Sequence, residues 1–398
     1  MKFNVELHSF DVELLEGDMV TRRSVLLGLG GVTAIAIGGG AAFAFTRTPT
    51  RALTPWQEPG TAADPRVRAL EWAVLAPNPH NRQPWLVELV GEDQALVYCD
   101  LDRRLPMTDP FDRQITIGLG AFVELYSLGA QHDGFAVELL PFPEGAPASD
   151  ARLDARPVAQ LTLAERPMGF DPLFAEVLKR RTTKEPFTDR PVREPTIAGL
   201  GRATHHTTFA GTLEPAHVDR LKDLAWQGWL VEARTPRTWQ ESVDLIRIGR
   251  VEIEANPDGV DLGGPMFEAL ALAGLLTRET ISEPGTMAYT TGLESYRDMM
   301  SSSRGFVWLT TPENSRAEQL AAGRDWLRVN LAATAVGLAV HPLSQALQEY
   351  EEMATLREAV HDALGATAPR TVQMLARVGY GPQVPPSPRW PARSRLIG

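Results

Sequence analysis

Two short segments, about a hundred residues apart, constrain this chain most strongly. Residues 76–85 read APNPHNRQPW, so prolines that fix a turn stand beside the amide side chains of Asn81 and Gln83. Residues 179–187 read KRRTTKEPF and bring four cationic side chains together. Planar amides suit the polar edge of a flat ring, and fixed cations suit a phosphate group. Taken alone, however, a basic run is more often a solvated helix end, and that alternative stays open.

The first segment resembles the SxxNxQPW signature of FMN-dependent nitroreductases, and the second resembles their RRSxR-type phosphate motif. In an ordinary nitroreductase the basic motif comes first, and each flavin sits between two subunits. Here the order is reversed and each motif occurs once, which is similar to the fused Acg subfamily. The resemblance implies FMN as the cofactor and an α+β, nitroreductase-like fold. It also implies a single-chain pseudo-dimer of two related halves, for which a homodimer is not required.

The resemblance also implies which residues hold FMN. Arg180, Thr182 and Lys184 take the phosphate positions, with threonine where the family commonly has serine and with an extra residue before Phe187. Two further positions are a backbone amide after a small-residue helix and an arginine near the C-terminus. No catalytic side chain is expected, because hydride transfer at a flavin requires no side-chain base. The candidate cofactor-binding residues are Pro77, Asn78, Asn81, Gln83, Arg180, Arg181, Thr182, Lys184, Leu343, Ser344 and Arg389.

The N-terminal residues have the pattern of an export signal. Arg22 and Arg23 precede an apolar, glycine- and alanine-rich run at 25–45, and Ala42 and Ala44 form an A-x-A arrangement. This resembles a twin-arginine signal cut after Ala44, and it implies the twin-arginine translocase as a partner and export across the cytoplasmic membrane. Since the run approaches bilayer-spanning length, an uncleaved membrane anchor is the alternative.

After this predicted signal at 1–45, the composition of residues 46–64 predicts a linker. The two motifs divide the rest into halves at 65–170 and 171–398. A strand–helix–strand order is predicted at about 98–140 and again, with its helix at 324–337, at about 307–343. Residues 241–304 break the pattern and predict either a lid over the site or an extra packing element.

Composition excludes several classes of function. A net charge of −11 repels phosphate backbones, so nucleic-acid binding is not expected. Cys99 is the only cysteine, which excludes an intramolecular disulfide, a CxxC redox pair and a cysteine-rich zinc site. The histidines lack zinc-ligand spacing, so no metal is expected.

The resemblance also implies a small-molecule electron donor and an acceptor as partners. The resemblance implies hydride transfer from NAD(P)H or another reduced donor, through the flavin, to a nitroaromatic, a quinone or a similar acceptor. The alternative function is a flavin-binding or flavin-sequestering protein with a closed site and little turnover. A third possibility, a relic without cofactor, predicts that Arg180, Lys184 and Arg389 do not converge in space.

Overall fold

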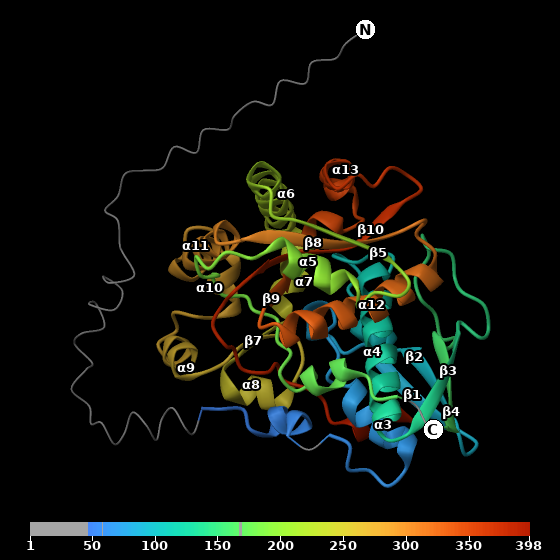
Figure 1. Cartoon of the computed structure of the whole chain (residues 1–398). Coiled ribbons are helices and arrows are strands. Elements are labelled where there is room, and N and C mark those ends of the chain that lie inside the picture. Colours follow the sequence, from blue (N-terminus) through green and yellow to red (C-terminus); the bar gives the residue numbers. More distant parts are fainter. Residues whose placement is uncertain (1–46, 58, 167–168) are drawn as a thin grey trace. The chain divides into compact units, whose positions relative to one another are not determined.

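Two helices of 20 residues each, α4 (Arg113–His132) and α12 (Arg316–Ala335), pack closely against one another at the centre of the fold (Figure 1). A Cβ atom added to Gly120 of α4 would overlap the carbonyl oxygen of Leu320, and one added to Gly323 of α12 would overlap that of Ile117. Each backbone thus occupies the space that a side chain of the other helix would need, so only glycine fits at the crossing.

The computed structural model describes residues 47–57, 59–166 and 169–398; the predicted export signal lies outside these ranges. The described residues form a five-stranded sheet of order β11-β1-β2-β4-β3, a four-stranded sheet of order β5-β8-β10-β9, and a small parallel pair, β6-β7. The strands are β1 (Trp85–Val90), β2 (Gln94–Cys99), β3 (Phe135–Pro141), β4 (Ala159–Glu165), β5 (Thr208–Thr212), β6 (Ile246–Ile248), β7 (Val260–Leu262), β8 (Gly305–Thr311), β9 (Ala339–Pro342), β10 (Thr371–Gly379) and β11 (Leu396–Ile397).

The two larger sheets share one topology. The order β1-β2-β4-β3 matches the order β5-β8-β10-β9, and every pairing within these two sets is antiparallel. In addition, α4 connects β2 to β3 as α12 connects β8 to β9. The fold is therefore α+β with two topologically equivalent halves. The C-terminal strand β11 pairs with β1 in parallel, so the end of the chain completes the sheet of the first half.

The remaining helices follow local signals in the sequence. Asp64 caps α3, and Pro65 stands in its first turn, where a missing backbone N–H costs nothing. The α12 helix begins at Arg316, eight residues before the predicted start at 324, because Ser315 and Glu318 form a capping box. The other α-helices are α3 (Pro65–Ala73), α5 (Glu194–Gly201), α6 (Pro215–Arg234), α7 (Pro236–Asp244), α8 (Gly249–Ala255), α9 (Pro265–Leu272), α10 (Arg278–Ser282), α11 (Met287–Ser301) and α13 (Ala354–Ala363). Short 3-10 helices are η1 (Arg51–Trp56), η2 (Pro79–Asn81), η3 (Leu101–Arg103), η4 (Pro172–Glu176), η5 (Gln345–Leu347), η6 (Glu351–Met353) and η7 (Ala392–Arg395).

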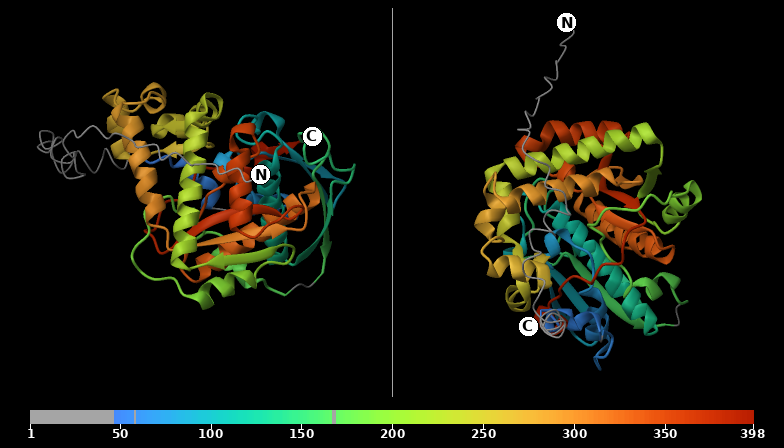
Figure 2. Two further views of the ribbon diagram at one scale, coloured as in Figure 1. Left: turned by 90° about the horizontal axis from the view of Figure 1, so that it is seen from above. Right: turned by 90° about the vertical axis from the view of Figure 1, so that its left-hand side faces the viewer.

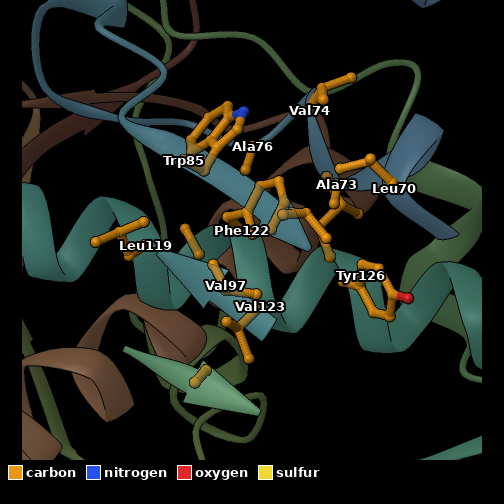
Figure 3. Packing of buried hydrophobic residues seen from close by; sticks show 14 of the residues in the cluster. Leu70, Ala73, Val74, Ala76, Trp85, Val97, Leu119, Phe122, Val123 and Tyr126 are labelled. Atoms are coloured by element: carbon orange, nitrogen blue, oxygen red, sulfur yellow. The ribbon is translucent and has the colours of Figure 1, made fainter. Parts of the chain in front are cut away.

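The core of the first half is packed around Trp85. Its indole stacks on Phe122 of α4 with ring centroids 4.8 Å apart, among Leu70, Val97 and Tyr126 (Figure 3). Trp85 is fully buried, so it is a core residue, as its place after the signature turn predicts. Because Trp85 begins β1, the core also fixes the position of the turn that precedes it.

Residues 241–304 are more ordered than the sequence indicates. They contain β6, β7 and the helices α8 to α11, which gather on one side of the molecule beside α6 (Figure 2). They share a small apolar core centred on Val243, Leu276 and Ile281.

The segment predicted as a linker also takes part in the fold. Ala52 and Trp56 of η1 are buried, and the Trp56 indole donates a hydrogen bond to the Ser387 carbonyl at 2.8 Å. Residues 51–56 are thus attached to the folded body, because their apolar side chains bury surface against it. Within the ranges described, no helix is both long and apolar enough to cross a membrane.

The crossing of α4 and α12 gives a stability prediction. Gly120→Ala forces the two helices apart and should lower the free energy of unfolding by about 2 kcal/mol or more, measured by urea denaturation. Gly292→Ala in α11 is the matched control, because a Cβ atom there meets nothing within 4 Å. That variant should be as stable as the parent or slightly more stable. Equal stability of the two variants would contradict a tight crossing.

Candidate active site

The signature turn is built from left-handed backbone. His80, Asn81 and Gln83 have φ values of 47°, 52° and 52°, which non-glycine residues adopt only where their surroundings hold them. The Asn78 carboxamide oxygen accepts a hydrogen bond from the Gln83 amide at 2.7 Å and closes the turn. Helix α4 packs closely against the turn at Gly118. A Cβ atom at this position would lie only 3.0 Å from Pro79, so the missing side chain of glycine lets the two segments approach.

The side-chain carboxamides of the turn form hydrogen bonds with the C-terminal segment and with the insertion at 241–304. The Gln83 carboxamide donates to the Pro257 carbonyl at 2.7 Å and accepts from the Trp390 amide at 2.8 Å. The Asn81 carboxamide donates to the Pro388 carbonyl at 3.0 Å. Gln83 is fully buried, and Asn78 also donates to the Ala76 carbonyl. In each of these two carboxamides, the oxygen and the nitrogen therefore both have a hydrogen-bond partner within the protein. In this structure Gln83 and Asn78 hold the turn in shape. Their contact with a cofactor stays a prediction.

Three arginines meet above a buried indole. The guanidinium carbons of Arg180, Arg181 and Arg389 lie 6.0, 4.9 and 5.4 Å from the centre of the Trp56 ring. Arg180 and Arg389 both donate to the Leu75 carbonyl at 3.4 Å, and both are buried. The two arginines therefore converge although 209 positions separate them in the sequence. The relic hypothesis predicted that they would not.

Among the described residues, no carboxylate pairs directly with this arginine cluster, and Asp261 attracts Arg389 only from a longer distance. Within the described ranges, no carboxylate oxygen lies within 4.0 Å of Arg180, Arg181 or Arg389. Burial lowers the pKa of Arg389 to about 9, and Arg180 repels it further. Burial lowers the pKa of Arg180 to about 10, with Arg181 adding repulsion. Buried cations without a counter-charge are costly, so the cluster favours an anion.

Lys184 extends the positive region toward the signature turn. Its side chain is exposed, yet desolvation lowers its pKa and Asp261 of β7 partly restores it. Desolvation also raises the pKa of Asp261, against the attraction of Lys184 and Arg389. Desolvation, with Lys184 and Arg82, lowers the pKa of His80 to about 4, so this imidazole is neutral at pH 7. The basic motif and the signature turn therefore lie within electrostatic reach of each other.

The remaining predicted residues differ in their surroundings. Leu343 is buried and its amide donates to the Leu375 carbonyl at 2.8 Å, so that amide is not available to a ring nitrogen. Ser344 is half-buried at the start of η5 and remains the candidate of that pair. Thr182 and Pro77 are half-buried, whereas the neighbouring Thr183 is buried with its amide donating to the Val340 carbonyl.

Two important residues were not among the predicted ones. Trp56 lies in the segment predicted as a linker, and its ring packs against the three arginines. A tryptophan is unusual in a linker, and this was the feature of the sequence that could have indicated its role. Arg377 is the only charged residue of the buried strand β10. A single arginine within such a strand is a stronger indication of a specific role. Its guanidinium donates to the Thr183 and Glu185 carbonyls at 3.1 and 2.8 Å, so it holds the basic motif in place.

Arg377 also connects the motif to β9. It donates to Nδ1 of His341 at 3.0 Å and stacks on Phe187 at 3.9 Å. Burial lowers the pKa of Arg377 to about 10. Burial also holds the pKa of His341 well below its usual value, and the positive charges of Arg377 and Lys184 lower it further. His341 is therefore neutral and accepts the hydrogen bond that orients Arg377.

The insertion is clamped to the signature turn by a buried carboxylate. Asp258 lies 2.6, 2.8 and 3.5 Å from nitrogens of Arg103, Arg247 and Arg82. The next amide, that of Gly259, donates to the Asn81 carbonyl at 3.3 Å. The insertion is thus a fixed wall of the site at this point. In the part of the chain that the structure describes, no three acidic, histidine or cysteine side chains are grouped to hold a metal ion.

Comparison with known proteins finds similar chains in Mycobacterium tuberculosis. Two Mycobacterium tuberculosis proteins described as "Putative NAD(P)H nitroreductase" are similar to it. The protein acg is 28% identical over 335 residues, covering 82% of this chain and 92% of acg. The other is 27% identical over 331 residues, covering 80% of this chain and 87% of the relative. No protein-family model matches the chain.

Solved nitroreductases align more loosely. The FMN-dependent nitroreductase NfnB of Mycobacterium smegmatis, solved with NADPH, aligns at 18% identity and a TM-score of 0.32, over 52% of this chain and 87% of that one. NfnB from sphigopyxis sp. strain HMH aligns at 15% identity and a TM-score of 0.34, over 55% of this chain and 93% of that one.

The clamp on the insertion gives a second prediction. Asp258→Ala leaves three arginines without their common partner and should cost about 3 kcal/mol of unfolding free energy. Urea denaturation measures the loss. Asp154→Ala, which removes an exposed pair with Arg156, should unfold with the parent. If both variants unfolded with the parent, the insertion would not depend on this clamp.

Proposed function

We propose that this protein is an FMN-dependent oxidoreductase of the nitroreductase type. The observation that carries the proposal is the convergence of Arg180, Arg181 and Arg389 without a carboxylate partner among the described residues. The Nε atom of Arg389 is buried and has no hydrogen-bond partner there, so this cluster has donors to spare for an added anion. A phosphate dianion fits this set, because guanidinium groups bind its oxygens with paired N–H donors.

Each part of the site has a role in this proposal. The three arginines bind the phosphate, and Lys184 adds positive charge from the solvent-exposed side of the basic motif. Ser344 is the polar group left to meet the ring, since Gln83 and the Leu343 amide are engaged elsewhere. The Asn81 carboxamide is engaged as well, because it donates to the Pro388 carbonyl and accepts from Arg389. Bound FMN would supply two-electron hydride chemistry, and the protein would orient it and set its electrostatic surroundings.

The similar proteins support the same proposal. The two relatives share more than a quarter of their residues with this chain over at least 80% of its length, and their description names NAD(P)H nitroreductases. NAD(P)H is accordingly the proposed donor, and a nitroaromatic, a quinone or a similar acceptor is the proposed substrate. The twin-arginine pattern at 22–23 and the apolar run at 25–45 support export, where NAD(P)H is scarce. A reduced quinone is therefore the second donor to examine.

A flavin-sequestering function remains the alternative, and one observation favours it. The insertion is fastened to the signature turn through Asp258 and through the bond from Gln83 to Pro257. A wall that is fixed in this way can restrict the approach of external substrates. Sequestration and catalysis both require the arginine cluster to bind the phosphate of the flavin. The two functions differ only in whether the bound flavin is reduced and reoxidised.

Removing one arginine separates phosphate binding from ring binding. Arg389→Gln should weaken FMN binding at least tenfold, because a hydrogen bond to a charged group contributes about 1.5–3 kcal/mol. Riboflavin, which lacks the phosphate, should bind the variant and the parent alike. Quenching of flavin fluorescence measures both affinities. Arg193→Gln, at an exposed arginine, is the control. An equal loss for FMN and riboflavin would place Arg389 at the ring or in the fold, not at the phosphate.

Turnover distinguishes the two functions. The FMN-loaded protein should lose its visible flavin absorbance under nitrogen when NADPH or a reduced quinone is added, and regain it on addition of a nitroaromatic or quinone. Following both steps by absorbance identifies the donor as well. Flavin bands that persist with every donor would support sequestration, and a chain that binds no FMN would reject both functions.

A further inference from the structure

A carboxyl group is buried near the signature turn without a cation to pair with it. Glu232 of α6 is 5% exposed, and no basic nitrogen of the described residues lies within 4.0 Å of its carboxylate. Its two oxygens accept hydrogen bonds from the Ser242 hydroxyl at 2.9 Å and from the Gln348 carboxamide at 2.8 Å. The other titratable groups within electrostatic reach of this carboxyl group are Glu241, Tyr296 and Tyr350. A glutamine would fill the same place without the cost of a buried charge, so an ionisable group here indicates a role beyond packing.

This carboxyl group is connected to the signature turn through one hydroxyl. The Ser242 Oγ atom, which contacts Glu232, also lies 3.4 Å from Nε2 of His80. The other ring nitrogen of His80, Nδ1, forms no hydrogen bond with the described residues and is not among the buried polar atoms that lack a partner, so it is open to solvent. Side chains from α6, α7 and the turn thus form a continuous line of hydrogen bonds from the interior to the wall of the proposed site.

On the basis of the proposed function, we propose that Glu232, Ser242 and His80 form a proton relay for the electron acceptor. A quinone that takes a hydride from the reduced flavin keeps one negative oxygen, and this oxygen must still form an O–H bond. The Nδ1 hydrogen of His80 forms that bond while Nε2 takes the Ser242 proton. Ser242 in turn takes the carboxyl proton, which leaves Glu232 ionised, and a proton from solvent restores the carboxyl group.

The relay requires a neutral imidazole, because an imidazolium carries hydrogens on both nitrogens and accepts none from Ser242. Burial, with Lys184 and Arg82, lowers the pKa of His80 to about 4. Burial also raises the pKa of Glu232 above its ordinary value, so Glu232 titrates at a higher pH than His80. An ionised Glu232 accepts from Ser242, whose oxygen then accepts from Nε2–H of His80. A protonated Glu232 donates to Ser242, and the hydrogen of His80 then resides on Nδ1.

NMR of the full chain tests this coupling before any flavin is added. In protein with ¹⁵N-labelled histidine, the shifts of the two ring nitrogens report which one carries the hydrogen, and His80→Gln assigns the signals. Lowering the pH through the titration of Glu232 should move the hydrogen of His80 from Nε2 to Nδ1. The change should be lost in Glu232→Gln and in Ser242→Ala. It should be kept in Glu294→Gln, at an exposed glutamate of α11. A His80 tautomer that is the same in all these proteins at every pH overturns the relay.

Reoxidation of the FMN-loaded chain is the kinetic test. Flavin reduced by light in the presence of EDTA is mixed with a quinone, which needs a proton, or with ferricyanide, which takes electrons alone. The ratio of the quinone rate to the ferricyanide rate should fall at least tenfold in Glu232→Gln and in Ser242→Ala, since a positioned proton donor contributes about 10²–10⁴-fold. Glu294→Gln should keep the ratio of the parent.

The outcomes separate the relay from the proposed function. A chain that binds no FMN overturns the proposed function. A flavin protein whose Glu232→Gln and Ser242→Ala variants keep the ratio of the parent overturns the relay alone. So does a ratio that falls in Ser242→Ala but not in Glu232→Gln, because the proton would then reach Ser242 from a source other than the buried carboxyl group.

Discussion

The contact between α4 and α12 is the constraint on which the rest of the structure depends. Gly120 and Gly323 let the two backbones meet, and this fixes how closely the two halves approach. Glu124 of α4 adds charge to the contact, since it accepts from Arg324 and Arg328 of α12 at 2.8 and 2.9 Å. Two positions before Gly120, Gly118 seats the signature turn on the same helix. One helix therefore sets both the spacing of the halves and the position of the turn.

The site that results is held by neutral contacts and left with excess positive charge. Carbonyl groups accept most of the hydrogen bonds of Arg377, Arg180 and Arg389, and a carbonyl has no charge to offset the burial of a cation. By contrast, Asp258 collects three arginines and anchors the insertion firmly. Charges that build the wall are paired, whereas charges at the centre are not. An anionic ligand is the simplest partner for such an arrangement.

Much of the fold could be predicted from local patterns. The α3 cap, the hairpin of β1 and β2 and the helix α4 lie where turn residues and apolar spacing indicate them. The start of α12 lies eight residues before the predicted one, because the signal that begins the helix is the Ser315 capping box and not the small residues of its second half. The regular structure of 241–304 was missed because its elements are short and its helices are stabilised by a core that residues from several of them share.

The sequence by itself determined the chemical types present: a proline-bracketed turn with amides, a cationic segment, a late arginine and an apolar N-terminal run. It also determined that two halves are possible, because the strand–helix–strand order recurs. Only the tertiary structure decided which groups are free. The Gln83 carboxamide forms hydrogen bonds with the Trp390 amide and the Pro257 carbonyl, and the Leu343 amide donates to the Leu375 carbonyl. The Trp56 ring lies against the arginine cluster. Those pairings join positions that lie from 32 to 333 residues apart in the sequence, and local preference carries no information about them. They arise when burial forces each polar group to find a partner.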